Sequence, residues 1–519
     1  MNMNCKKITA TFILFSSLLC KSFSAIVLPE ILADSMVLQR NQLIPIWGTA
    51  DVCETVEISF GGQTVSAETN EKGEWKIWMG PFSTSATPSS MVISGSNRIE
   101  LKNILVGEVW LCAGQSNMQW LLEKTTGGPE AIAAANNPNI RLFNVNRDVA
   151  FKRRKGKLAS WQVCTPLTVR EFSAVGYFFA LELYQELGIP VGIINASYGG
   201  SQAEAWTPVE YLAANDVLKP CIEREKTWEV ERPQIRTEFE KQTKEWKELS
   251  KKARAAGEKV PPQPVMPDAL REHRISASIY KNMIEPLIPF AIQGVLWYQG
   301  EANETRAEQY GVLLPTMIQA WRDRWGQGDF PFAIVQLPNF RSRSAEPTDE
   351  AWSHLRDAQR KTFLQMPNTG LIVTIDIGDA EDIHPVNKQP VSKRLALWAI
   401  AHVYDRPVPK SGPVYTTAKF KKKKAIVYFS EIGDGLATCD GNPLQEFAIA
   451  GLDKQWNWAN AAILGKDRVM VWSDQVKRPK AVRYAFNSNP ANPNLSNNSC
   501  LPASPFRTDD WPGPTDGVR

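Results

Sequence analysis

Residues 107–120 read GEVWLCAGQSNMQW, and this stretch sets the expected architecture. Its apolar run, residues 109–113, suits a strand that is buried on both faces, as strands of parallel sheets are. Gly114 permits a sharp turn, which would carry Ser116 to the carboxyl edge of the sheet, where open α/β folds bind ligands. Ser116 is therefore a candidate nucleophile, and the simpler alternative is a serine that only caps the next helix.

Downstream of this stretch, predicted strands alternate with helices, which indicates an α/β domain with a mostly parallel sheet covered on both faces. A helix is expected near residues 308–325, where aromatic and aliphatic side chains share one face and Pro315 marks a kink or the true start. Those aromatics are interpreted as core. The predicted strands are residues 140–145, 191–196, 292–298, 332–337 and 371–375.

Three other regions have different patterns. Residues 26–105 contain short strands between turns and predict a β-sandwich domain, whereas residues 209–285 form a charged helical insertion expected to lie over the catalytic domain. Gly257 should end its main helix. Strands return in residues 407–519, which should form a β-rich domain whose tail wraps back over the body. This partition leaves residues 106–406 as the catalytic domain.

Composition limits the classes of partner. The 519 residues are 43% hydrophobic, enough for two or three cores, and 59 basic and 55 acidic residues leave a net charge of only +4. Nothing here suggests a nucleic acid partner. Residues 1–25 resemble a signal peptide, so a secreted or periplasmic protein is expected. Leu19 is bulkier than the small residue expected before a lipidated cysteine, which argues against Cys20 as a lipid anchor. No later apolar run is long enough to span a membrane.

The cysteines and histidines predict neither a disulfide framework nor a metal site. Removing the signal segment leaves six scattered cysteines, which allow fifteen pairings. The chain has four histidines and no C-x-x-C pair, so no metal-ligand spacing is present and no cofactor is expected. The six cysteines are Cys53, Cys112, Cys164, Cys221, Cys439 and Cys500.

Three later clusters could complete a serine hydrolase site. The first, in residues 195–206, has paired glycines whose N–H groups could face a developing negative charge, and the second, WYQGEAN at 297–303, offers the Gln299 amide as a donor. The third, DIGDAEDIHP at 376–385, places His384 near carboxylates, as a base for Ser116 requires. His402 lies in an apolar helix, and His273 and His354 lie in charged, exposed settings.

Together these blocks resemble the sialate O-acetylesterase family of the SGNH (GDSL-like) hydrolases. The likeness runs from about Leu28 to Trp511 and includes MVLQR at 36–40 and LPASPFR at 501–507. It implies a three-layer α/β/α SGNH-hydrolase domain flanked by β-rich, sandwich-like domains, with no metal. By position, Ser116 is similar to the nucleophile and His384 to the base. The oxyanion hole would use the N–H of Ser116, the N–H of Gly200 or Gly199, and the Gln299 side chain.

The triad acid is the least determined residue. The superfamily pattern places it three residues before the histidine, where this chain has Glu381, whereas the family's Asp-Ile-His form selects Asp382. Ile383 and Pro385 favour an extended backbone, in which residues two apart point to the same side. We therefore expect Asp382 to be the acid, with Glu381 and Asp379 as alternatives.

The resemblance implies an esterase that removes O-acetyl groups from sugars, most simply from sialic acids, through an acetyl-enzyme on Ser116. The motifs specify the ester chemistry and not the sugar, so acetylated plant polysaccharides such as xylan or pectin remain alternative substrates. A non-catalytic sugar-binding protein, with 18 tryptophans as stacking platforms, is a third interpretation. Neither the oligomeric state nor the residues that bind the sugar follow from the sequence.

Overall fold

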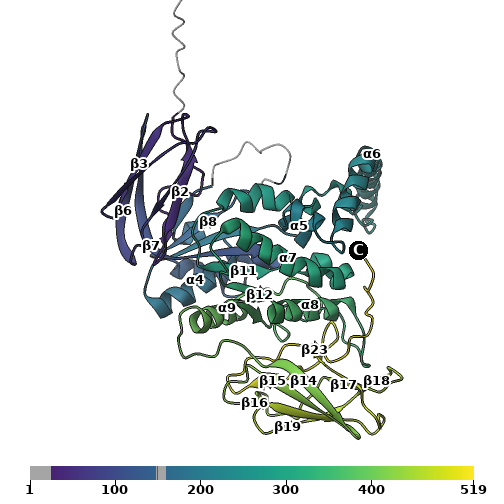
Figure 1. The fold of residues 1–519 in the computed structure, drawn as a ribbon. Helices are drawn as coiled ribbons and strands as arrows, with labels where there is room; N and C mark the ends of the chain where they lie inside the picture. Colours follow the sequence, from purple (N-terminus) through teal and green to yellow (C-terminus); the bar gives the residue numbers. More distant parts are fainter. Residues whose placement is uncertain (1–24, 148, 150–158) are drawn as a thin grey trace, which may run out of the picture.

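A central, mostly parallel sheet organises the molecule (Figure 1). The structure, a computed structural model, describes residues 25–147, 149 and 159–519, so the expected signal segment lies outside the described residues except for Ala25. Every pair along the sheet is parallel except the antiparallel β8 and β9, which confirms the predicted sheet. Its order is β13 (Thr369–Ile372), β12 (Phe332–Val335), β11 (Gly294–Tyr298), β7 (Arg98–Gly114), β10 (Val191–Ser197), β8 (Asn137–Asn144) and β9 (Trp161–Cys164).

The register brings the ends of three strands together. Gly114 at the end of β7 pairs with Ser197 of β10 and with Tyr298 of β11. The segments that follow these strands therefore leave the sheet at one edge. They are the Ser116, Gly-Gly and Gln299 segments singled out in the sequence, and β7 lies between the other two.

Helices cover both faces of the sheet, because alternate residues of its buried strands point to opposite sides. Trp110 and Cys112 of β7 pack with α4 (Ala174–Leu187) and α9 (Gln389–His402), whereas Val109 and Leu111 belong to the apolar core that contains α7 (Ala307–Trp325) and α8 (Ala351–Gln365). The predicted helix near 308–325 is confirmed as α7, with Pro315 inside it and its aromatic face buried. The shorter helices include α2 (Gly128–Ala134) and α3 (Pro166–Val169).

Strand β7 continues from the amino-terminal β region into the central sheet. The expected boundary near residue 105 falls inside this 17-residue strand. Its first half pairs with β6 (Ser85–Ser94) and β1 (Val37–Gln39), and its second half pairs with β10 and β11. The other strands of this region are β2 (Ile44–Thr49), β3 (Thr55–Phe60), β4 (Gln63–Glu68) and β5 (Glu74–Met79).

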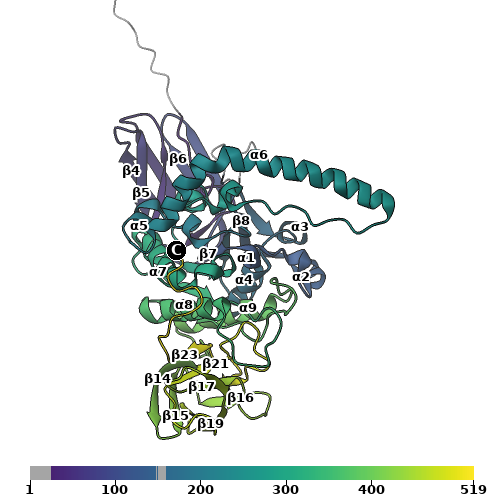
Figure 2. The same cartoon turned by 90° about the vertical axis from the view of Figure 1, so that its right-hand side faces the viewer.

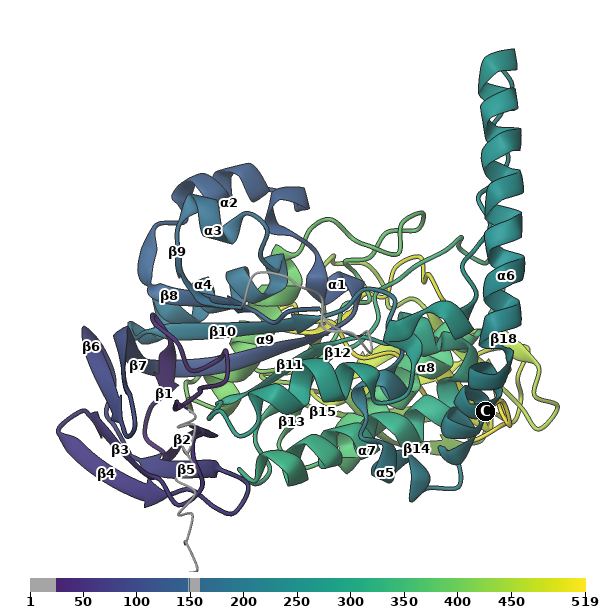
Figure 3. The same cartoon turned by 90° about the horizontal axis from the view of Figure 1, so that it is seen from above.

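The helical insertion contains α5 (Val209–Ala213) and the 38-residue α6 (Lys219–Ala256). Gly257 ends α6 in the left-handed conformation, as the sequence predicts. The expectation that the insertion lies over the catalytic domain holds only at its root, since most of α6 projects away from the body (Figures 2 and 3). The chain then runs back along α6, where Trp246 donates to the carbonyl of Pro261, and returns to the body at a short helix, η4 (Glu272–Arg274).

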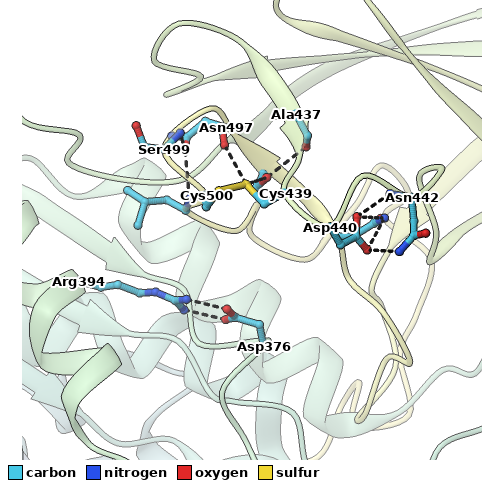
Figure 4. The surroundings of a disulfide bond; sticks show 12 residues. Asp376, Arg394, Ala437, Cys439, Asp440, Asn442, Asn497, Ser499 and Cys500 are labelled. Atoms are coloured by element: carbon cyan, nitrogen blue, oxygen red, sulfur yellow. Dashed lines mark hydrogen bonds and ion pairs between the residues drawn. A yellow bond between two sulfur atoms is a disulfide. The ribbon is translucent and has the colours of Figure 1, made fainter.

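The carboxyl-terminal region is β-rich, and a disulfide lies within it. Cys439 and Cys500 each follow one of two paired strands, β16 (Leu436–Thr438) and β22 (Leu495–Asn497), and form a pairing that the sequence could not name (Figure 4). The tail wraps back over the body as expected, since Thr515 donates to Glu308 of α7. Two four-stranded sheets complete the region. The strand order of the first is β14 (Val414–Lys421), β15 (Lys424–Ser430), β20 (Arg468–Trp472) and β19 (Asn460–Leu464). The strand order of the second is β18 (Trp456–Trp458), β17 (Phe447–Ala450), β21 (Ala481–Tyr484) and β23 (Phe506–Arg507).

Among the helices that the structure describes, none combines the length and the apolar character needed to cross a bilayer.

Candidate active site

Ser116 lies at the first position of the short helix α1 (Ser116–Gln119), immediately beyond β7. The turn requires glycine at 114, where φ is +138° and a Cβ atom would lie 2.2 Å from the carbonyl oxygen of Tyr298. The residue in the N-cap position is Gln115, so the alternative of Ser116 as a helix cap does not hold. Ser116 Oγ instead lies 2.9 Å from Nε2 of His384.

The other ring nitrogen of His384 faces Asp382. Nδ1 lies 3.2 Å from Asp382 Oδ1, and the same oxygen accepts the backbone N–H of His384 at 2.9 Å. Glu381 is exposed, and Asp379 accepts the backbone N–H groups of Glu381 and Asp382. Of the three carboxylates considered, the structure thus places Asp382 against the imidazole. Serine, histidine and aspartate have the order and the contacts of a catalytic triad.

The paired glycines lie beside the nucleophile. A Cβ atom on Gly199 would lie 3.4 Å from Ser116 Cβ, so a side chain there would crowd the serine. The N–H of Gly199 donates to Gln119 Oε1 at 2.7 Å. Gly200 has φ of +72° and its carbonyl accepts from Arg274 of η4, whereas no hydrogen bond within the described residues occupies its N–H. Of the two glycines, Gly200 is therefore the one with a free donor.

Gln299 reaches the same edge of the sheet but offers no free donor there. Its side chain is fully buried, and Nε2 donates to the carbonyl of Ser201 at 3.2 Å and to Asn303 Oδ1 at 2.7 Å. An amide nitrogen has only two hydrogen atoms, so both are occupied. The expected donation from Gln299 to an oxyanion is corrected accordingly: in this arrangement Gln299 braces the segment that follows the Gly-Gly pair.

The brace continues into a buried ion pair. Asn303 donates to Glu204 Oε2 at 2.9 Å, and Glu204 Oε1 accepts from Arg306 at 2.5 Å and from Arg224 of α6 at 3.0 Å. Burial opposes the charge on Glu204, but the two guanidinium groups outweigh it and lower the pKa of this carboxyl. The root of the insertion is thus tied to the loop beside the nucleophile.

The remaining histidines differ in part from expectation. His354 is only 4% exposed, which contradicts the predicted exposed setting; it lies between Asp349 and Glu308, and these carboxylates raise its pKa despite burial. His273 is half-buried and stacks on Tyr198, and burial lowers its pKa to about 4, helped by neighbouring arginines. His402 accompanies Trp398 on α9, as expected of an apolar helix.

Sequence reasoning missed the residues that surround the triad. Trp120 stacks on the His384 ring with centroids 5.5 Å apart, and Asn117, next to the nucleophile, contacts both Glu301 and Lys388. Asn117 and Trp120 stand in the quoted stretch, but their partners come from distant segments. Within residues 25–147, 149 and 159–519, no three His, Cys, Asp or Glu side chains gather as a metal site would require.

Comparison with known proteins gives a consistent result. Residues 268–396 match the model of a carbohydrate esterase family, the sialic acid-specific acetylesterases. Sialate O-acetylesterases from rat and human are 28% and 26% identical, over 91% and 92% of this chain and 92% of each relative. The crystal structure of a carbohydrate acetylesterase from Xanthomonas citri is 35% identical, with a TM-score of 0.78, over 94% of this chain and 100% of that one.

Proposed function

Because the chain belongs to the carbohydrate esterase family of sialic acid-specific acetylesterases, we propose that it removes O-acetyl groups from sugars through an acetyl-enzyme on Ser116. The family makes it a carboxylic ester hydrolase. The observation that carries the serine mechanism is the pair of contacts at His384, 2.9 Å to Ser116 Oγ and 3.2 Å to Asp382 Oδ1. A hydroxyl is a weak nucleophile at neutral pH, and a histidine held by a carboxylate activates it.

In the first half of the reaction, Ser116 Oγ attacks the acetyl carbonyl carbon while Nε2 of His384 takes the hydroxyl proton. Asp382 holds the imidazole in the required tautomer and stabilises the imidazolium. The oxyanion accepts hydrogen bonds from the backbone N–H groups of Ser116 and Gly200. When the carbon–oxygen bond to the sugar breaks, His384 returns its proton to the departing sugar oxygen.

In the second half, water replaces the sugar. His384 removes a proton from the water as it attacks the acetyl carbonyl, the same two N–H groups bind the oxyanion, and the proton passes to Ser116 Oγ as acetate leaves. The free hydroxyl of Ser116 and the neutral imidazole are restored. Apart from the ester and water, each proposed step uses only the side chains and backbone groups already described.

O-acetylated sialic acids are the proposed substrates, since the rat and human relatives are sialate O-acetylesterases. Residues 1–25 are proposed to export the protein to the compartment where it meets such sugars. The test is acetate release, measured in parallel from an aryl acetate, O-acetylated sialic acids and acetylated xylan. Release from the sialic acids above that from xylan is expected. A preference for xylan would move the substrate to plant polysaccharides, and no release from any ester would overturn the proposed function.

A further inference from the structure

A buried lysine lies behind the triad. Lys388 occupies the N-cap position of α9, four residues after His384, and is 1% exposed. Its Nζ donates to Asn117 Oδ1 at 2.5 Å, and within the described part of the chain it has no ion-pair partner within 4.0 Å. A buried ammonium without a carboxylate partner is costly, so its presence calls for an explanation.

Asn117 connects this lysine to the triad. It is fully buried, directly follows the nucleophile, and its Nδ2 donates to Glu301 Oε1 at 2.6 Å and to the carbonyl of Ile383 at 3.0 Å. Ile383 is the residue between Asp382 and His384. One amide therefore joins the nucleophile helix to the loop that carries both other members of the triad. Because Lys388 fills the oxygen end of that amide, it fixes which way the nitrogen end points.

We propose that Lys388 is a positioning residue, which orients Asn117 so that Asn117 holds the His384 loop against the nucleophile helix. The inference deepens the proposed function and rests on it. The arrangement is supported from the other side of the loop, where the backbone N–H of Lys388 donates to Thr125 Oγ1 and the Thr126 N–H donates to the carbonyl of Val386. Residues 383–388 are thus anchored at both ends.

The charge of Lys388 adds a readout that packing alone would not give. Burial lowers the pKa of Lys388 to about 7, against the raising effect of the Glu301 and Asp382 carboxylates, so the side chain is charged below neutral pH. The groups facing it from the elements packed around it are Asn117 of α1, Trp120 just beyond α1, Tyr298 of β11, Glu301, and Asp382 of the histidine loop. Burial and Glu301 raise the Tyr298 pKa far above neutrality, which leaves that phenol uncharged.

The first test is Lys388→Met, which keeps the length of the aliphatic chain and removes donor and charge. We expect kcat to fall about tenfold or more with KM within about twofold, because a displaced base slows chemistry more than binding. Loss of a cation near the triad should also move the acidic limb of the kcat/KM profile to higher pH, since protonated His384 becomes easier to form. Lys393→Met removes an exposed lysine from the same helix and should match the wild type.

A double-mutant cycle separates action through Asn117 from a general loss of packing. If Lys388 acts through Asn117, Lys388→Met combined with Asn117→Ala should be no slower than Asn117→Ala alone. If the loss of kcat in the double variant equals the product of the losses in the two single variants, the proposal is overturned. It is also overturned if Lys388→Met has the wild-type kcat and pH profile. Rates are expressed per active site, titrated with an organophosphate that labels Ser116, so that misfolded protein does not count.

Glu301→Gln keeps the inference testable if the lysine variant does not fold. Burial raises the pKa of Glu301, whereas the Asn117 amide and Lys388 favour its charged form. Gln retains an oxygen that can accept from Asn117 but removes that charge, so the acidic limb should move to lower pH, opposite to the Lys388→Met shift. An unmoved limb would overturn the electrostatic part of the proposal. If the wild-type protein releases no acetate, the proposed function itself is wrong. If the wild type is active and Lys388→Met has the same kcat and pH profile, only the proposed role of Lys388 is wrong.

Discussion

The proposed reacting groups and the groups proposed to hold them lie in contrasting surroundings. The side chains of His384 and Asp382 are 30% and 56% exposed, whereas Asn117, Lys388 and Gln299 are at most 1% exposed. Exposed groups can meet a sugar ester and water, but a single contact in solvent positions a side chain poorly. The buried residues supply the missing rigidity through fully desolvated hydrogen bonds. Function at the surface thus depends on geometry fixed underneath.

The most damaging change should be Ser116→Ala, which removes the reacting atom and leaves the buried frame intact. We expect kcat to fall by about a thousandfold or more, with a melting temperature close to that of the wild type. Acetate release and a thermal unfolding curve measure the two effects. A folded variant that retained a tenth of the wild-type rate would show that Ser116 is not the nucleophile.

The second largest loss of activity should come from replacing the exposed acid, Asp382. Asp382→Asn removes the charge that stabilises the imidazolium, and we expect about a hundredfold loss of kcat. Glu381→Gln is the matched control, because Glu381 is exposed next to it without contacting the ring, and its rate should stay within about twofold of the wild type. If the two results were exchanged, the loop would adopt a different conformation during catalysis and Glu381 would be the acid.

Gln299→Met tests a buried side chain that lies close to the site but donates its hydrogen bonds to Ser201 and Asn303. The change leaves the Ser201 carbonyl without its donor and removes one of the two donors to Asn303 Oδ1, which keeps the Ala203 N–H. This should cost about 1 to 3 kcal/mol of stability and about tenfold in kcat. Stability and rate should fall together, unlike in Ser116→Ala. A hundredfold lower kcat at an unchanged melting temperature would instead identify Gln299 as a direct oxyanion donor.

The smallest effect on the rate should come from the disulfide in the carboxyl-terminal β region. Replacing Cys439 and Cys500 together by serine should leave kcat and KM within about twofold, while the free energy of unfolding falls by about 2 to 4 kcal/mol, because the unfolded chain loses a cross-link. Esterase assays and urea unfolding, with wild type in dithiothreitol for comparison, provide the measurement. A large loss of activity in a folded variant would mean that this region shapes the active site.

These contrasts show where sequence reasoning reached its limit. The predicted strands and the face of α7 were read correctly, since burial on both sides of a strand or on one side of a helix leaves a periodic local pattern. His354 was misread as exposed, because its charged sequence neighbours did not reveal that Asp349 and Glu308 would enclose it. Gln299 lies at the predicted edge of the sheet, but the direction of its side chain depends on the acceptors Ser201 and Asn303. No local sequence pattern indicates which acceptors the amide binds.

The sequence by itself determined the α/β class, the strand-turn-helix around Ser116 and the order of the four blocks, because these depend on residue type and short-range spacing. Only the tertiary structure decided that Asp382 faces His384, that the N–H of Gly199 is bonded to Gln119 while that of Gly200 is not bonded within the described residues, and that Lys388 donates to Asn117. The physical reason is that a hydrogen bond has a direction and each donor serves few acceptors. The acceptor that each donor binds is therefore determined only when the fold brings the competing groups together.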